Sequence, residues 1–144
     1  MTTHKKSFTL IEILIFVTIL SLFFVSAITI TIVSLRNLKI QEHKILATRY
    51  AEELLEWLRG EKEADWNRFA TRTGTYCFNS LPINSWGNFG NCSSYSLNNL
   101  YKRELILSSY GTPPYQINVS ITVSWQELGQ TYQVPINTVF TVWE

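Results

Sequence analysis

The sequence predicts an α+β fold, in which a long N-terminal transmembrane and amphipathic α-helix packs on a small C-terminal antiparallel β-sheet. Three observations support this prediction. Residues 8–35 are almost entirely apolar, residues 36–60 continue them with an amphipathic pattern, and the last third of the chain alternates apolar with polar residues. With 144 residues in all, the chain has room for one exterior domain, predicted at residues 61–144, besides this helix.

The apolar segment is long enough to cross a membrane. Residues 8–35 comprise 28 residues with one charge, Glu12, whereas about 20 apolar residues already span a bilayer as a helix. A carboxylate inside such a segment is costly unless a cation pairs with it, so Glu12 is a candidate functional residue.

The charges that flank this segment predict its orientation. Positive residues precede it and belong to residues 1–7, namely His4, Lys5 and Lys6. The positive-inside rule therefore places the N-terminus in the cytoplasm and everything after Leu35 outside. We expect a single-pass membrane protein with an exterior C-terminal domain.

Residues 36–60 are predicted to continue the same helix as its amphipathic half. The charged side chains fall largely off one apolar stripe, which is expected to pack on the protein's own sheet. Gly60 is the predicted stop signal of the helix. The stripe recurs at spacings of three, four and seven residues and consists of Leu38, Ile45, Leu46, Tyr50, Ala51, Leu54 and Leu58.

Between the helix and the predicted strands, two segments are less regular. Residues 61–73 are expected to form a short helix or turn that folds Trp66 and Phe69 against the main helix. Residues 74–100 are rich in Gly, Asn and Ser and are predicted to be a loop. Its aromatic residues fit either a cover for the sheet or a contact surface for a partner: Tyr76, Phe78, Trp86, Phe89 and Tyr95.

The two cysteines, Cys77 and Cys92, bracket this loop in the predicted exterior part. An even cysteine count in an oxidising compartment predicts a disulfide, and two free thiols are the alternative. A zinc site is not expected, because no histidine or second cysteine pair lies nearby in the sequence.

The last third of the chain is predicted to be antiparallel sheet. Residues 117–125 and 132–142 alternate apolar with polar residues, which is the pattern of half-buried strands, and residues 126–130 are the turn between them. Pro135 lacks an N–H donor, so the second of these strands is expected at an edge or at a bulge. Residues 103–109 are predicted to be a third strand, followed by a turn at residues 111–114, so we expect a three- or four-stranded antiparallel sheet on the C-terminal half of the helix.

The N-terminus closely resembles a known signal. The string Lys5-Lys6-Ser7-Phe8-Thr9-Leu10-Ile11-Glu12 resembles the cleavage and methylation signal of type IV pilins and type II secretion pseudopilins. The resemblance covers about residues 5 to 60. It implies a leader peptide at residues 1–7, cleavage by a prepilin peptidase between Ser7 and Phe8, and N-methylation of Phe8. The family usually has glycine before the cut, where this chain has Ser7.

The resemblance also implies a role for Glu12 in assembly. Residues 8 and 12 are one helical turn apart, so the carboxylate of Glu12 could pair with the freed amine of Phe8, in its own subunit or in a neighbour, and set the axial register of a helical stack. Two other readings of the apolar segment stay open. A plain signal-anchor helix leaves Glu12 unexplained, and a secretory signal peptide would be cut after Ala27.

No catalytic constellation is found in the sequence, and no enzyme activity and no cofactor are expected. His4 lies in the leader, and His43 is predicted to be a solvated helix residue. The 12 Lys and Arg residues nearly balance 11 Asp and Glu residues, which argues against a nucleic-acid footprint over the whole protein. The exterior candidates for a basic patch are Arg68, Arg72, Lys102 and Arg103, so DNA ranks last among the partners.

The resemblance therefore implies a minor pilin or pseudopilin of a type IV pilus or type II secretion-like filament. Its partners would be other pilin subunits, the prepilin peptidase, an inner-membrane platform protein, a cytoplasmic ATPase and the lipid bilayer. Filament-tip initiation, a secretion piston and DNA uptake are three open roles. The alternative from another class is a non-polymerising, single-pass membrane-anchored binding protein.

Overall fold

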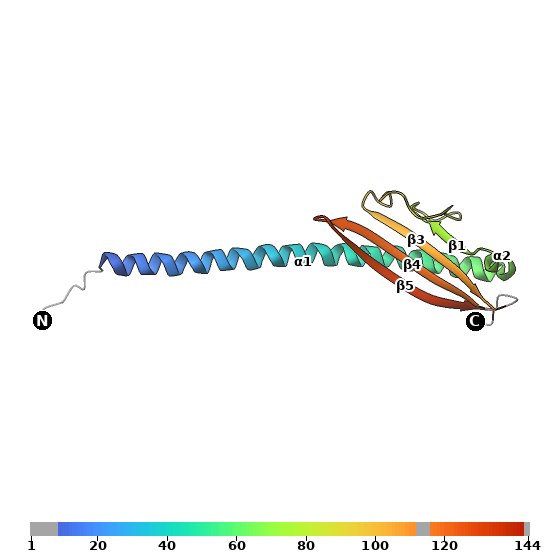
Figure 1. The fold of residues 1–144 in the computed structure, drawn as a ribbon, viewed down its shortest axis with the longest axis horizontal. Coiled ribbons are helices and arrows are strands. Elements are labelled where there is room, and N and C mark those ends of the chain that lie inside the picture. Colours follow the sequence, from blue (N-terminus) through green and yellow to red (C-terminus); the bar gives the residue numbers. More distant parts are fainter. Residues whose placement is uncertain (1–8, 112–115, 143–144) are drawn as a thin grey trace, which may run out of the picture. The chain divides into compact units, whose positions relative to one another are not determined.

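The computed structural model describes residues 9–111 and 116–142, and it confirms the predicted α+β fold. A long helix, α1 (Leu10–Ala64), is followed by the short helix α2 (Trp66–Ala70) and by a five-stranded antiparallel sheet (Figure 1). The chain divides into two compact units, residues 1–41 and residues 42–144. Each unit is described separately below.

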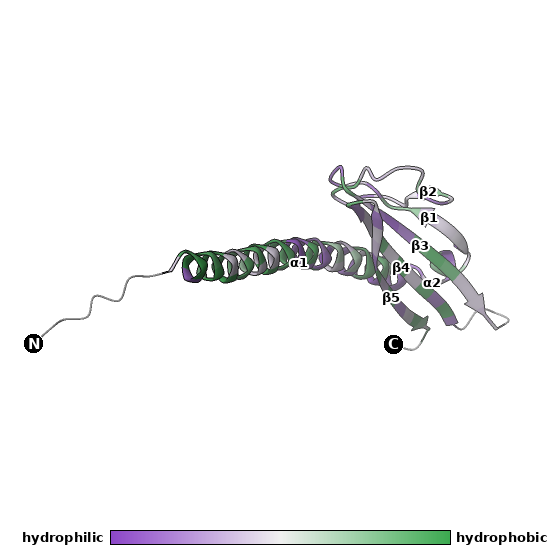
Figure 2. Ribbon diagram, turned by 60° about the vertical axis from the view of Figure 1, so that its left-hand side comes forward, coloured by the Kyte–Doolittle hydropathy of each residue, from purple (hydrophilic) through white to green (hydrophobic). Residues whose placement is uncertain are grey.

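The first unit consists of the N-terminal part of α1, and its apolar side chains point outward all around the helix. Residues 10–39 are exposed, and the exposed fractions of their large apolar side chains range from 40% at Leu20 to 83% at Leu10. Figure 2 shows this part of α1 as predominantly hydrophobic. The segment is long and apolar enough to cross a bilayer. Side chains exposed in this way need lipid or other helices around them.

Five hydroxyl groups of this segment are satisfied within the helix itself. Each donates a hydrogen bond of 2.7–2.9 Å to a backbone carbonyl three or four residues earlier. Such internal bonding suits a hydrocarbon environment, in which no water is available as a partner. The residues concerned are Thr18, Ser21, Ser26, Thr29 and Thr31.

In the second unit, the sheet has the strand order β2-β1-β3-β4-β5 and lies on one face of α1 (Figure 1). It has more strands than the three or four expected, because the loop region contributes two short ones. The strands are β1 (Gly74–Cys77), β2 (Asn88–Phe89), β3 (Tyr101–Tyr110), β4 (Gln116–Glu127) and β5 (Gln130–Thr141).

The core forms where the inner face of the sheet meets α1. The predicted alternation is confirmed, since every second side chain of β4 from Ile117 to Trp125 is buried. These strand residues pack against small and branched residues of α1. The fully buried residues of the helix are Ala47, Ala51, Leu54 and Leu58.

The predicted stripe on α1 is wrong at two positions. Leu38 and Ile45 remain 66% and 58% exposed, whereas the rest of the stripe lies in or beside the core. The reason is geometric. Ile45 lies two positions before Ala47, which is about 200° around a helix that turns about 100° per residue. Ile45 therefore lies on the side of the helix opposite Ala47, whereas Leu38 belongs to the first unit.

The end of α1 also differs from the prediction. Gly60 does not stop the helix, which continues to Ala64. The break comes at Asp65, whose extended backbone (φ −160°, ψ 97°) begins α2 and whose carboxylate accepts a hydrogen bond of 3.0 Å from the Arg68 N–H. The short helix expected in this region is confirmed, and it buries Phe69.

β4 and β5 form a long hairpin with an unbroken register from Glu127↔Gln130 to Gln116↔Thr141. The turn is shorter than predicted, and both of its residues have positive φ, with Leu128 at 52° and Gly129 at 77°. β5 lies at the edge of the sheet, which confirms the expectation drawn from Pro135. Most of the other predicted turn, residues 112–114, lies outside the described residues.

Candidate functional site

Glu12, the candidate assembly residue, lies in the first turn of α1. Its backbone N–H donates to the Thr9 carbonyl at 3.1 Å, and its side chain is exposed. A carboxylate at this position is favoured by the positive end of the helix dipole. The predicted cleavage site at Ser7 and Phe8, including the amine that would pair with Glu12, lies outside the described residues.

The exterior loop is closed by a disulfide between Cys77 and Cys92, with an S–S distance of 2.02 Å and a Cα–Cα distance of 5.0 Å. This pairing was the sequence-based prediction. Within the closed loop, β1 pairs with β2 through Tyr76↔Phe89 and Cys77↔Asn88. The loop is therefore a small extension of the sheet.

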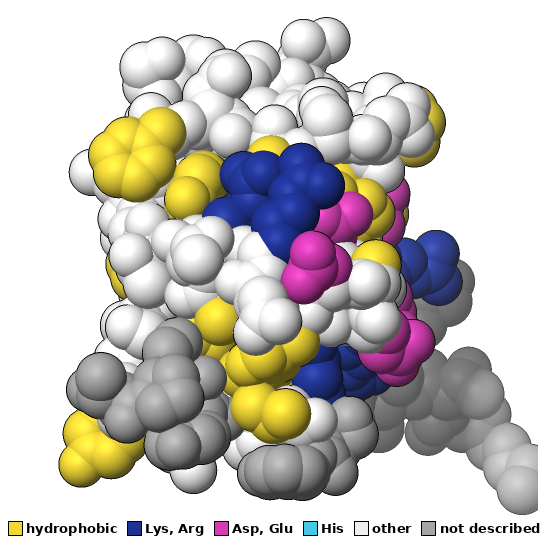
Figure 3. All heavy atoms as spheres, turned by 90° about the vertical axis from the view of Figure 1, so that its right-hand side faces the viewer, with side chains coloured by type: hydrophobic (Ala, Val, Ile, Leu, Met, Phe, Trp, Pro, Cys, Tyr) yellow, Lys and Arg dark blue, Asp and Glu magenta, His cyan; other side chains and the backbone are white. Residues whose placement is uncertain are grey.

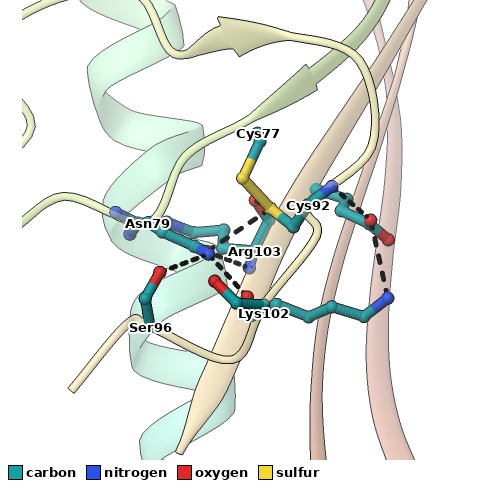
Figure 4. A network of polar contacts seen from close by, with 8 residues as sticks. Cys77, Asn79, Cys92, Ser96, Lys102 and Arg103 are labelled. Atoms are coloured by element: carbon teal, nitrogen blue, oxygen red, sulfur yellow. Dashed lines mark hydrogen bonds and ion pairs between the residues drawn. A yellow bond between two sulfur atoms is a disulfide. The ribbon is translucent and has the colours of Figure 1, made fainter. Parts of the chain in front are cut away.

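Asn79 connects the loop to β3 (Figure 4). Its Nδ2 donates to the Ser94 carbonyl and to the Ser96 Oγ, both at 3.0 Å, and its Oδ1 accepts from the Arg103 N–H at 3.0 Å. On the other side of the disulfide, the Cys92 N–H donates to Glu104 Oε1 at 2.9 Å. Both halves of the loop are thus attached to the same strand.

Arg103 is fully buried and joins three parts of the domain. Its Nε and Nη2 donate to the loop carbonyls of Phe78 (2.9 Å) and Ser80 (3.1 Å). Its Nη1 donates to the Tyr50 carbonyl (2.8 Å) and to Glu53 Oε2 (3.0 Å), both on α1. Burial lowers the pKa of Arg103 from its ordinary value, and the hydrogen bond with Glu53 opposes this effect. The guanidinium group holds the loop against the helix.

This burial corrects the list of basic candidates for nucleic-acid contact. Arg103 is unavailable, Lys102 pairs with Glu104 at 3.6 Å, and the Arg72 guanidinium lies 4.3 Å from the centre of the Trp86 ring. On the face drawn in Figure 3, basic side chains lie beside acidic ones with uncharged surface around them. The described residues form no broad basic surface on this face.

Most of the loop aromatics cover the sheet. Tyr76 and Phe78 are buried, and Trp86 contacts both rings, at 5.5 Å and 6.1 Å between ring centres. Trp86 Nε1 also donates to Glu61 Oε2 at 2.8 Å. Phe89 differs, because its ring is 77% exposed. The core role is therefore confirmed for three of these residues, and Phe89 is left as a surface side chain.

His43 was predicted to be solvated, and this is wrong. Its Nδ1 lies 2.8 Å from the Tyr101 hydroxyl, and its Nε2 lies 4.0 Å from Glu127 Oε2. The side chain of His43 is only 17% exposed. A sequence signal was present, since His43 lies four residues before Ala47 and so continues the buried side of α1.

No family model matches the chain, and no curated protein or solved structure matches it. The interpretation of the site therefore depends on its residues and their geometry.

The burial of Tyr101 predicts an alkaline loss of stability. Burial raises the pKa of Tyr101 to about 12, with smaller contributions from Tyr50, Glu42 and Glu127. An unfolded tyrosine titrates near pH 10. The stabilising effect is therefore complete below about pH 10 and is lost as the pH rises toward about 12. We expect the melting temperature of the full chain in detergent micelles to fall over this range, and to fall less in Tyr101→Phe.

Tyr110→Phe is the matched control for this measurement, because its ring is 72% exposed. This control should reproduce the alkaline fall of the unsubstituted chain. Equal falls in both variants would show that Tyr101 is not responsible.

Proposed function

We propose that the chain is a minor pilin or pseudopilin, a structural subunit of a type IV pilus or type II secretion-like filament. The observation that carries the proposal is the character of α1 within the first unit. This part of the helix is apolar on all sides, it is long enough to span a bilayer, and it has a carboxylate in its first turn. A helix that exposes apolar side chains all around must be covered either by lipid or by other helices.

Glu12 favours an assembly role over a plain anchor. A charged group within an apolar membrane-spanning segment is costly unless an opposite charge neutralises it. Cleavage between Ser7 and Phe8 would create such a charge, because the new α-amino group lies one turn from Glu12. In this proposal the subunit is held in the inner membrane with its second unit outside, and the platform protein then draws it into the filament.

The second unit suits an exterior position. Its loop is closed by the Cys77–Cys92 disulfide, a bond that persists in oxidising compartments. The residues of the core and the buried Arg103 hold the loop in one arrangement, so the domain can present a constant surface on a filament.

The proposal predicts that Glu12→Gln is processed normally but fails to assemble. The test is co-expression of the full chain with a prepilin peptidase and its assembly system, followed by intact mass with N-terminal fragmentation and by the yield of sheared filaments. Loss of one partner of a desolvated ion pair costs about 3–5 kcal/mol. This corresponds to a decrease in incorporation of about 100-fold or more.

Thr18→Val is the control, because its hydroxyl bonds only to the Ile15 carbonyl of the same helix among the described residues. It should be cleaved and incorporated like the unsubstituted chain. A chain that keeps residues 1–7 beside an active peptidase would instead support the membrane-anchored binding protein. Normal incorporation of Glu12→Gln would rule out the pairing role.

A further inference from the structure

The turn between β4 and β5 carries an exposed apolar side chain in a strained backbone. Leu128 and Gly129 form this two-residue turn, which the pair Glu127↔Gln130 closes. Leu128 has φ 52°, a left-handed conformation that suits asparagine or glycine and is an outlier for a bulky residue. Its side chain is 68% exposed. Leucine is therefore a poor residue for the turn itself, and strain of this kind points to a function for the side chain.

The turn lies at the end of the second unit at which α1 enters it. The carboxylate of Glu127 is 4.0 Å from Nε2 of His43, and His43 is the second residue of this unit. The far end of the hairpin lies beside the last turns of α1, where the Lys62 Nζ is 5.5 Å from the centre of the Phe140 ring. Within this unit the hairpin thus follows α1 from its entry to its end (Figure 1).

The exposed surface around Leu128 carries no charge. The one acid of the turn, Glu127, is directed toward His43, and only 11% of its side chain is exposed. An apolar residue with uncharged polar neighbours suits the layer between the lipid headgroups and the hydrocarbon, where an unpaired charge would be costly. The exposed neighbours of Leu128 are Gln126, Gly129, Gln130 and Thr131.

The apolar segment of α1 ends close to the same His43 in the chain. Leu35 and His43 are eight residues apart in one continuous helix, a distance of about 12 Å. Residues 10–35 of this helix are about 39 Å long, whereas the hydrocarbon core of a bilayer is about 30 Å thick. A helix that is too long for the bilayer tilts. A tilt shortens the distance between the membrane surface and one side of an exterior domain.

We infer that Leu128 inserts into the interfacial layer of the bilayer that holds α1, on the exterior side of the membrane. The inference rests on the membrane anchoring within the proposed function and not on filament assembly. Lipid is the favoured occupant, because the covalent link to the anchor keeps the turn near one membrane surface at a high effective concentration. A protein partner would have to arrive by diffusion. One leucine side chain binds weakly, so the contact is released when the subunit leaves the membrane.

The test places one full chain in each nanodisc of phosphatidylethanolamine and phosphatidylglycerol, with nitroxide groups on some of the lipid headgroups. A fluorescent label on Gln126→Cys reports on the turn. The same label on Tyr110→Cys is the control, because Tyr110 is 72% exposed and lies at the other end of the sheet, opposite Gln116. The native cysteines are joined to each other and do not take up the label. The nitroxide lipids should quench the label at the turn more strongly than the control label.

Leu128→Asn separates the role of the side chain from that of the turn. Asn-Gly is a preferred pair for a two-residue hairpin turn, so this variant should melt in detergent micelles at the same temperature as the unsubstituted chain or higher. Loss of the leucine should shift the equilibrium between inserted and free turn by about tenfold toward the free state. Quenching of the Gln126→Cys label should then fall to the level of the control.

Two results would overturn the inference. Equal quenching of the two labels in the chain that keeps Leu128 would show that the turn lies in water. Quenching at the turn that persists in Leu128→Asn would show that the turn approaches the membrane without its leucine. Because each nanodisc holds one chain, a second copy cannot cover the turn in this measurement.

The proposed function is assessed apart from this contact, because the nanodisc measurement needs neither peptidase nor assembly system. A chain that is never cleaved between Ser7 and Phe8 would refute the pilin proposal and leave the lipid contact unaffected. A chain that is cleaved, methylated and assembled, and whose two labels are quenched equally, would refute only the lipid contact. A chain that alkaline carbonate extracts from membranes would refute both.

Discussion

Arg103→Met is expected to lower the free energy of unfolding by about 3–5 kcal/mol, the usual cost of breaking a buried ionic network. The substitution leaves the buried carbonyl of Phe78 and the partly buried carbonyl of Ser80 without their guanidinium donors, and buried groups are expensive when unpaired. Glu53 contributes less to this cost, because its side chain is 40% exposed and regains water. Small domains have only about 5–15 kcal/mol of stability in total.

The measurement is guanidinium chloride unfolding of the full chain in detergent micelles, followed by tryptophan fluorescence. The neighbouring residue provides a matched control. Lys102 pairs with Glu104 near the surface, with 25% of its side chain exposed, so Lys102→Met should cost about 1 kcal/mol or less. Equal losses in the two variants would show that the Arg103 network does not hold the domain together.

The second large effect is expected from removal of the disulfide. Cys77→Ser combined with Cys92→Ser opens a cross-link between residues 15 positions apart, which in the chain-entropy model is worth about 3 kcal/mol. Asn79 and Arg103 still connect the loop to β3 and α1, so the variant should fold and melt at a lower temperature.

Reduction of the unsubstituted chain is the companion measurement. A thiol reductant should lower its melting temperature to that of the double serine variant and should leave the variant itself unaffected. A reduced chain that melts like the oxidised one would mean that the hydrogen bonds alone fix the loop.

Local patterns were sufficient to predict much of the fold. β3, β4 and β5 were recognised because one face of each is buried, so the period of two is visible in the sequence. β1 and β2 were not, since strands of four and two residues are too short to show a period. Ile45 was misplaced because its spacing of seven residues grouped it with Leu38, whereas it lies about 200° around the helix from the buried Ala47.

The residues that hold the exterior domain together were harder to predict than Glu12. Glu12 stands out because it is the one charge in an apolar segment. Arg103 gave no such signal, because its partner carbonyl at Tyr50 is 53 positions away in the sequence. His43 likewise depends on Tyr101, which is 58 positions away. Contacts of this kind become visible only when the sheet has been placed on the helix.

The proline of β5 has a consequence for chains that are crowded together. β5 is the last strand of the sheet, and its 12 residues carry no charge that would repel another strand. Hydrogen-bonded and non-hydrogen-bonded pairs alternate along β4 and β5, starting from the hydrogen-bonded pair Glu127↔Gln130 that closes the turn. Pro135 falls at a non-hydrogen-bonded position of this alternation, so its nitrogen points away from β4. The row of N–H donors along the outer edge of β5 is therefore interrupted near its middle. Where chains are crowded together, this missing hydrogen opposes fusion of their sheets into one amyloid-like ribbon.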